Sequence, residues 1–160
     1  MHCIVATDGS QASLIGARQF QWIADSREIT DVTVVAVVSP YAAVPFANEL
    51  TERRNVEPTD FSFQEEAGAA VDLVAGLFDG WGPTIHKQVR SGSPAAEIIR
   101  AAQEVGADLI SLASGSRGLT ATILLGTTAS RVQHSAPCPV LVCRPSRTSD
   151  SRVQPDGAGA

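Results

Sequence analysis

The sequence has few cysteines, few aromatic residues and no long apolar run. Its three cysteines are odd in number and lie within apolar stretches, so no disulfide framework is expected. No apolar run approaches the roughly 20 residues of a membrane-spanning helix. Met1 leads straight into an apolar segment, without the basic stretch and cleavage site of a signal peptide. We therefore expect a cytoplasmic protein without a membrane partner.

Basic residues are also scarce. Lys and Arg number 12 against 17 Asp and Glu, which gives a formal net charge of −5. Because nucleic-acid binding depends on clustered Lys and Arg, neither DNA nor RNA is an expected partner. The 160 residues, 44% of them hydrophobic, suffice for one domain with its own core. We place this domain at residues 1–145 and expect the polar residues 146–160 to form a flexible C-terminal tail.

The standard catalytic and nucleotide-binding motifs are missing. The chain contains neither G-x-x-x-x-G-K-[ST] nor G-x-G-x-x-G, and it has no nucleophile elbow. His2, His86 and His134 are scattered without the paired spacing of a metal-binding helix, so packing or capping roles fit them better. The sequence therefore predicts no catalytic residue and no metal ligand.

What the sequence does contain is an alternation of short β-branched runs with longer amphipathic stretches. Such alternation is typical of βαβ units and a parallel sheet. Because a run such as Val34–Val38 is continuously apolar, helices should cover both faces of the sheet. We expect an α/β fold with five strands, at Cys3–Ala6, Val32–Val38, Ile85–Val89, Asp108–Ala113 and Pro139–Cys143.

Two helices stand out between these strands. One carries an apolar stripe at steps of three and four, formed by Ala67, Ala70, Val71, Val74, Leu77 and Phe78. The other begins with Ser93 as its N-cap and Pro94 as its first residue, and Gly106 ends it. The segment Ser39–Thr59 contains three prolines and is expected to be a connection, with a helical turn around Asn48–Arg54.

One candidate site follows the first strand. In open parallel sheets, ligands bind beyond the carboxyl ends of the strands. After Thr7, Asp8 offers hydrogen-bond acceptors, Gly9 permits a tight turn and Ser10 can cap the next helix. Taken alone, this loop is better explained by a structural role, since such residues commonly end strands and begin helices.

A second candidate site follows the fourth strand and runs from Ala113 to Gly118, with Gly126 and Thr127 further along. Small residues let backbone N–H groups approach an anion, and a helix N-terminus favours phosphate. The hydroxyl groups of Ser114, Ser116 and Thr127 could donate further hydrogen bonds to the anion, and Arg117 could add positive charge. A flexible surface loop is an equally good interpretation of this composition.

The chain resembles the universal stress protein family in four segments: Ile4–Ser10, Gly92–Ala95, Ala107–Ile110 and Ala136–Val142. The opening Asp-Gly-Ser and the closing Pro-Cys-Pro-Val-Leu-Val form a specific combination, and the segments span nearly the whole chain. This resemblance implies a Rossmann-like sheet of strand order 3-2-1-4-5. Asp8 and the loop after Ala113 would then face one crevice, where the winding of the sheet reverses.

Family members that bind ATP carry the pattern G-x-x-G-x9-G-[ST], from which this sequence departs. If the distance from Asp108 is kept, the matching residues are Ala113, Ser116, Gly126 and Thr127. The other register uses Gly115 and Gly118, but it leaves only seven residues before Gly126. An alanine at a position that requires positive φ would cost about 1 kcal/mol or more and would hinder phosphate approach.

The resemblance also implies that the ligand is ATP, with ADP, AMP and cyclic AMP as alternatives. Mg²⁺ is a further ligand that the resemblance allows. Asp8 would bind the adenine or ribose side, the Val37 backbone would meet the adenine edge, and Gly126 with Thr127 would meet the phosphates. The remaining predicted site residues are Thr7, Ala113, Ser114, Gly115, Ser116, Arg117 and Gly118.

Three functions remain open. The first is a stress-response protein that binds an adenine nucleotide. The second is a dimeric interaction protein of the same family that has lost nucleotide binding, which Ala113 and Ser116 would favour. Slow nucleotide hydrolysis ranks last, because no water-orienting group is evident. Pro139–Cys143 would be an apolar edge strand, and together with the resemblance it implies a homodimer.

Overall fold

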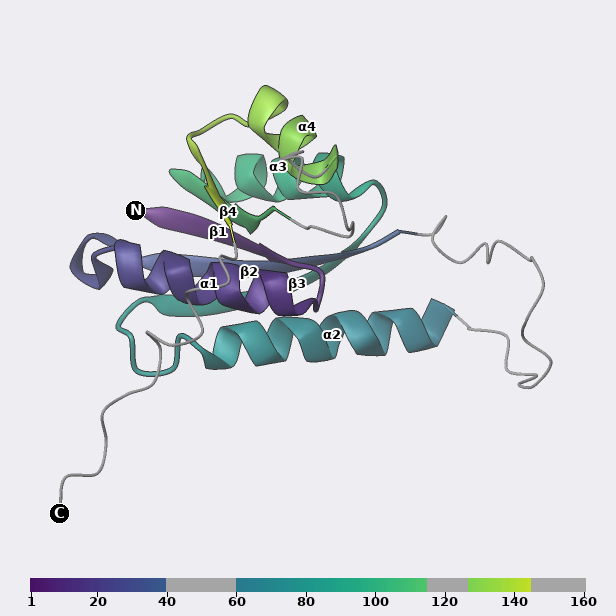
Figure 1. The fold of residues 1–160 in the computed structure, drawn as a ribbon, viewed down its shortest axis with the longest axis horizontal. Helices are drawn as coiled ribbons and strands as arrows, with labels where there is room; N and C mark the ends of the chain where they lie inside the picture. The colour runs from purple at the N-terminus through teal and green to yellow at the C-terminus, as the bar shows by residue number, and fades with distance from the viewer. Residues whose placement is uncertain (40–59, 115–126, 145–160) are drawn as a thin grey trace, which may run out of the picture.

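A computed structural model describes residues 1–39, 60–114 and 127–144 of the chain. These residues form an α/β fold whose parallel sheet is covered by helices on both faces (Figure 1). In chain order the elements are β1 (His2–Thr7), α1 (Gln11–Ile23), the 3-10 helix η1 (Ser26–Glu28), β2 (Asp31–Val38), α2 (Asp60–Gly76), β3 (Thr84–Ser91), α3 (Pro94–Val105), β4 (Leu109–Ala113), α4 (Thr127–Ser135) and β5 (Val140–Cys143).

The five strands are ordered β3-β2-β1-β4-β5 and every neighbouring pair is parallel, which confirms the expected Rossmann-like topology. All five predicted strand starts differ from the structure by one residue: β1, β2 and β3 begin one residue earlier, and β4 and β5 begin one residue later. Asp108 precedes β4, and its carboxylate accepts the N–H of His2 at 2.8 Å. Pro139 precedes β5, although its carbonyl still accepts the N–H of Ile110 at 3.0 Å. Because all the strands are parallel, their carboxyl ends lie at the same end of the sheet.

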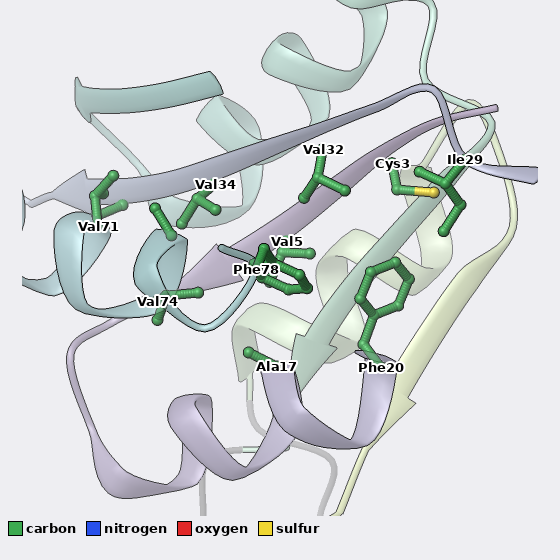
Figure 2. Close-up of a cluster of buried hydrophobic side chains, with 12 residues drawn as sticks. Cys3, Val5, Ala17, Phe20, Ile29, Val32, Val34, Val71, Val74 and Phe78 are labelled. Atoms are coloured by element: carbon green, nitrogen blue, oxygen red, sulfur yellow. The ribbon is translucent and has the colours of Figure 1, made fainter. Parts of the chain in front are cut away.

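The helices form two layers, one on each face of the sheet. Helices α1 and α2 cover one face, and α3 and α4 cover the other (Figure 1). Figure 2 shows the core under α1 and α2, where Phe20 and Phe78 approach each other edge to face with ring centroids 6.1 Å apart. The core on the opposite face is built around Ile4, Ile110 and Val132. Each face therefore buries its own apolar layer, as continuously apolar strands require.

The helix predictions were correct in place and partly wrong in detail. Helix α2 ends at Gly76, so Leu77 and Phe78 lie in the following turn, although Phe78 is still fully buried. Helix α3 begins at Pro94 as expected, but the Ser93 side chain makes no capping hydrogen bond. Gly106 ends α3 in the left-handed region, with φ of 60°. The helical turn expected around Asn48–Arg54 lies outside the described residues, as does the tail expected at 146–160.

Two further expectations concern cysteines and membranes. Cys3, Cys138 and Cys143 are all free thiols, so the cysteines form no disulfide framework. Within the described ranges, no helix combines the length and the apolar character needed to cross a bilayer.

Charged side chains join β3 to α3 on one face of the sheet. Arg90 of β3 donates to Glu97 at 2.9 Å and, through two nitrogens, to Glu104 at 2.8 and 2.9 Å. Glu97 is buried and also pairs with Arg100 at 2.8 Å. Because Arg90 and Glu97 lie mostly out of water, this pair is a structural contact rather than a solvated surface pair.

Candidate functional site

The strands are all parallel, but the direction in which successive strands are added to the sheet reverses between β1 and β4. The connection after β1 leads to α1 on one face, whereas α4, which follows β4 in the chain, lies on the opposite face (Figure 1). Open parallel sheets bind ligands where neighbouring connections diverge in this way. The carboxyl ends of β1 and β4 therefore bound the candidate site.

Hydrogen bonds fix the loop after β1. The Ser10 N–H donates to Asp8 Oδ1 at 3.0 Å, and the Ser10 side chain accepts the Ser13 N–H at 3.2 Å. The predicted N-cap of α1 is thus Ser10, as expected. Gly9 has φ of 75°, and a Cβ there would lie 3.2 Å from Ala70 Cβ of α2. The loop therefore requires glycine both for its backbone conformation and for its close approach to α2.

The Asp8 carboxyl group is held in its ionised form. Loss of part of its hydration raises its pKa, but hydrogen bonds, chiefly those from Ser10, outweigh this effect, and the net pKa lies below the ordinary value. An ionised carboxylate accepts hydrogen bonds and donates none. Asp8 is exposed at the carboxyl edge of the sheet and is therefore suited to ligand hydroxyl or amino groups.

The register of the sheet brings Val37 level with Asp8. Thr7 of β1 pairs with Ala36 of β2, and each of the two site residues comes one position later. Val37 is half-buried and pairs on its other side with Arg90 of β3. Asp8, directly after β1, and Val37, in the neighbouring strand β2, thus lie at the same carboxyl end of the sheet. These are the two residues predicted for the adenine side.

Ala113 lies in an ordinary strand rather than in a left-handed turn. It is the last residue of β4 and pairs with Cys143 of β5. A Cβ at Gly16 of α1 would lie 3.0 Å from Ala113 Cβ, so the methyl group of Ala113 packs against α1. The cost expected for alanine at a position of positive φ therefore does not arise at Ala113.

Only the two ends of the second predicted loop are described. Ser114 is half-buried, and its N–H donates to the Cys143 carbonyl at 2.8 Å, which extends the β4–β5 ladder by one residue. Thr127 is exposed and is the first residue of α4. The other predicted residues of this loop lie outside the described residues: Gly115, Ser116, Arg117, Gly118 and Gly126.

Sequence reasoning missed two residues that shape this site. Gly16 permits the close contact with Ala113, and Ser13 lies buried beneath the loop after β1. The available signal was their place on the inner stripe of α1, together with Ala17 and Phe20. A small or polar residue on an otherwise apolar stripe indicates a close approach or a buried hydrogen bond.

His2 and His86 lie away from the candidate site. His2 Nε2 is 2.7 Å from Thr33 Oγ1, and His86 Nε2 is 2.8 Å from Asp31 Oδ1, near the amino ends of the strands. Across the described ranges, no group of three or more His, Cys, Asp or Glu residues is arranged to hold a metal ion.

Comparisons with known proteins agree with this topology. The model of the universal stress protein family matches residues 1–144. A universal stress protein of Methanocaldococcus jannaschii is 32% identical over 142 residues, which cover 88% of this chain and 80% of that protein.

Two solved structures share the fold. A universal stress protein in complex with cAMP has a TM-score of 0.65 and 22% identity, with 91% of this chain and 98% of that chain covered. A universal stress protein family protein of Arabidopsis thaliana with AMP bound has a TM-score of 0.61 and 15% identity, with coverage of 93% and 94%.

Proposed function

This chain belongs to the universal stress protein family, and from that premise we propose that it is a stress-response protein that binds ATP or a related adenine nucleotide between β1 and β4. The observation that carries the proposal is the ionised Asp8 carboxylate, held by hydrogen bonds at the point where the connections diverge. Relatives of the same fold with cAMP or AMP bound support it.

Charge supports one orientation of the nucleotide. A carboxylate repels phosphate but accepts hydrogen bonds from ribose hydroxyls and the adenine amino group. Asp8 and the neighbouring Val37 backbone therefore suit the nucleoside end of the ligand. The phosphates would then lie toward Gly126 and Thr127, where the N-terminus of α4 carries partial positive charge. Mg²⁺ would accompany the phosphates.

Calorimetric titration with ATP, ADP, AMP and cyclic AMP, each with and without Mg²⁺, tests this function. We expect Asp8→Ala to weaken binding by about 10- to 100-fold, because hydrogen bonds to charged groups contribute about 1.5–3 kcal/mol. Asp79→Ala removes an exposed carboxylate from the turn after α2, at the other end of the sheet, and serves as the matched control. A wild-type protein that binds none of the four nucleotides would contradict the proposal.

We further propose that two copies of the chain pair through β5. In the described part of the chain, β5 pairs only with β4, and its residues Val140, Leu141 and Val142 are half-buried. The carbonyls of Pro139 and Cys143 accept hydrogen bonds from the β4 side. Backbone direction alternates along a strand, so the Val142 N–H points to the open edge of the sheet, where a second β5 can accept it.

Substitution by proline tests this dimer. Val142→Pro removes one N–H from the open edge without breaking the β4–β5 ladder. Val89→Pro is the matched control on the other edge strand, because the Gly92 N–H donates to Val38 and residues at odd positions in β3 therefore face outward. In equilibrium sedimentation, we expect a wild-type dimer, a Val89→Pro dimer and a Val142→Pro monomer. A monomeric wild-type protein would exclude the proposed pairing.

A further inference from the structure

Two buried hydroxyl groups lie directly beneath the loop that carries Asp8. Thr7 ends β1, Ser13 lies in the first turn of α1, and both are buried. Their oxygen atoms, Thr7 Oγ1 and Ser13 Oγ, are 2.9 Å apart. Buried hydroxyls are rarely placed together without a full set of partners, because an unpaired polar group out of water is costly.

The geometry settles which hydroxyl donates to the other. Ser13 Oγ donates to the Ser10 carbonyl at 2.8 Å, which uses its only proton. The bond between the two hydroxyls must therefore run from Thr7 to Ser13. Thr7 Oγ1 in turn accepts the Gly9 N–H at 3.1 Å. The result is a directed chain of hydrogen bonds from Gly9 through Thr7 and Ser13 to Ser10.

These hydrogen bonds hold the loop from both ends. The hydroxyls engage the Gly9 N–H and the Ser10 carbonyl, and the Ser13 N–H adds a hydrogen bond to the Ser10 side chain. Both hydroxyl protons are consumed inside the protein, so neither Thr7 nor Ser13 has a proton left to donate to a ligand. A role for Thr7 as a direct ligand contact through a donated hydrogen bond is therefore disfavoured.

We propose that Thr7 and Ser13 are positioning residues, whose hydroxyl groups fix the Asp8–Ser10 loop so that the Asp8 carboxylate is presented to a nucleotide. The nucleotide in this inference is that of the proposed function, on which the inference rests. The gain is preorganisation, because a loop that is already ordered loses less conformational freedom when a ligand binds.

The ionisation of Asp8 supports this assignment. Desolvation raises the pKa of Asp8, but hydrogen bonds, chiefly those from Ser10, outweigh it and lower the pKa. If the Ser13 hydroxyl is removed, the Ser10 carbonyl loses its donor, and the loop no longer holds the Ser10 N–H as firmly against Asp8 Oδ1. The carboxyl group should then take up its proton at a higher pH than in the wild-type protein.

The first test follows the Asp8 carboxyl signal by NMR as the pH is lowered, without nucleotide. We expect the midpoint to move to higher pH in Ser13→Ala and in Thr7→Val, an isosteric change that removes the hydroxyl. Thr7→Ser keeps the hydroxyl, so its midpoint should stay close to that of the wild-type protein. Ser111→Ala is the matched control, because it removes a buried hydroxyl from β4 whose partner is Cys143 Sγ, away from the loop.

The second test is nucleotide titration of the same variants, with thermal unfolding measured in parallel. Ser13→Ala and Thr7→Val should weaken ATP binding by about 3- to 10-fold, as expected when one or two groups must be ordered on binding. Ser111→Ala should bind as the wild type does. If Ser13→Ala lowers the unfolding temperature but moves neither the Asp8 midpoint nor the affinity, the two hydroxyls are merely structural and the inference is wrong.

The two proposals can fail separately. If wild-type protein binds no nucleotide and the Asp8 midpoint still shifts in Ser13→Ala and Thr7→Val, the proposed function is wrong while the positioning of Asp8 is supported. If ATP binds and Asp8→Ala weakens it, but Ser13→Ala and Thr7→Val behave like Ser111→Ala, the function is supported and the positioning role is overturned.

Discussion

Gly16 is the residue that decides how closely α1 approaches β4. A Cβ at this position would lie 3.0 Å from Ala113 Cβ and 3.3 Å from Cys143 Cβ. We expect Gly16→Ala to lower the free energy of unfolding by about 1–3 kcal/mol, as overpacking of a close contact does. Urea denaturation followed by circular dichroism measures this change.

Two variants separate packing from helix propensity in this prediction. Gly68 lies within α2 with no atom near its missing Cβ, so Gly68→Ala should raise the free energy of unfolding by about 0.5–1 kcal/mol. Ala113→Gly removes the methyl group that faces Gly16 and should recover part of the loss when combined with Gly16→Ala. If Gly16→Ala stabilised the protein as Gly68→Ala does, the packing argument would be wrong.

Single residues also mark how far sequence reasoning reaches. Asp8, Gly9 and Ser10 were predictable because local turn and cap chemistry selects their residue types. The direction of the Ala113 methyl group was not, because it depends on which face of β4 meets α1. The partners of the Ser13 hydroxyl were also beyond reach, since a serine on the inner stripe of a helix indicates a buried hydrogen bond but not which groups make it.

At the scale of elements, the contact between β3 and α3 depends on one buried carboxylate. Glu97→Gln keeps the shape of the side chain but removes the charge that faces Arg90 and Arg100. Because the mostly buried Arg90 then keeps only its half-exposed partner Glu104, we expect the free energy of unfolding to fall by about 1–3 kcal/mol at neutral pH. Chemical denaturation at low and high salt measures the effect.

The control for this prediction is an exposed ion pair. Asp25 pairs with Arg27 at 2.7 Å beside η1, but water surrounds both side chains. Asp25→Asn should leave stability within experimental error of the wild type, since exposed pairs contribute little. Equal losses for Glu97→Gln and Asp25→Asn would show that burial does not set the strength of the Arg90 contact.

Elements were more predictable than their ends and their order. The β-branched runs identified all five strands, because burial on both faces imposes a continuous apolar pattern. The strand order came from the family resemblance, since local pattern carries no information about which strands pair. The end of α2 was missed because the apolar stripe continues to Phe78, which packs into the core from a turn rather than from the helix.

At the scale of the whole molecule, one buried thiol should make stability depend on alkaline pH. Burial raises the pKa of Cys3 from its ordinary 9.0 to about 11. The folded state therefore holds this proton more tightly than the unfolded state. The associated stability is fully present below about pH 9 and is lost as the pH rises toward 11, by about 2 kcal/mol.

Cys3→Ala isolates this contribution. The variant is less stable at every pH because a side chain in the core becomes smaller. Its free energy of unfolding should nevertheless fall less steeply than that of the wild type between pH 9 and pH 11. Parallel curves from urea unfolding across this range would contradict a role for the Cys3 thiol.

The central position of β1 has a consequence for the protein as it is synthesised. Of the five strands of this sheet, β1 leaves the ribosome first and can pair with β2 early, yet its other neighbour, β4, begins only at Leu109. The N–H of His2 gains its hydrogen-bond acceptor only after Asp108 has been synthesised. Until β4 has emerged, one edge of the central strand stays unpaired, so a nascent chain that stalls earlier exposes an aggregation-prone strand edge to chaperones and to other nascent chains.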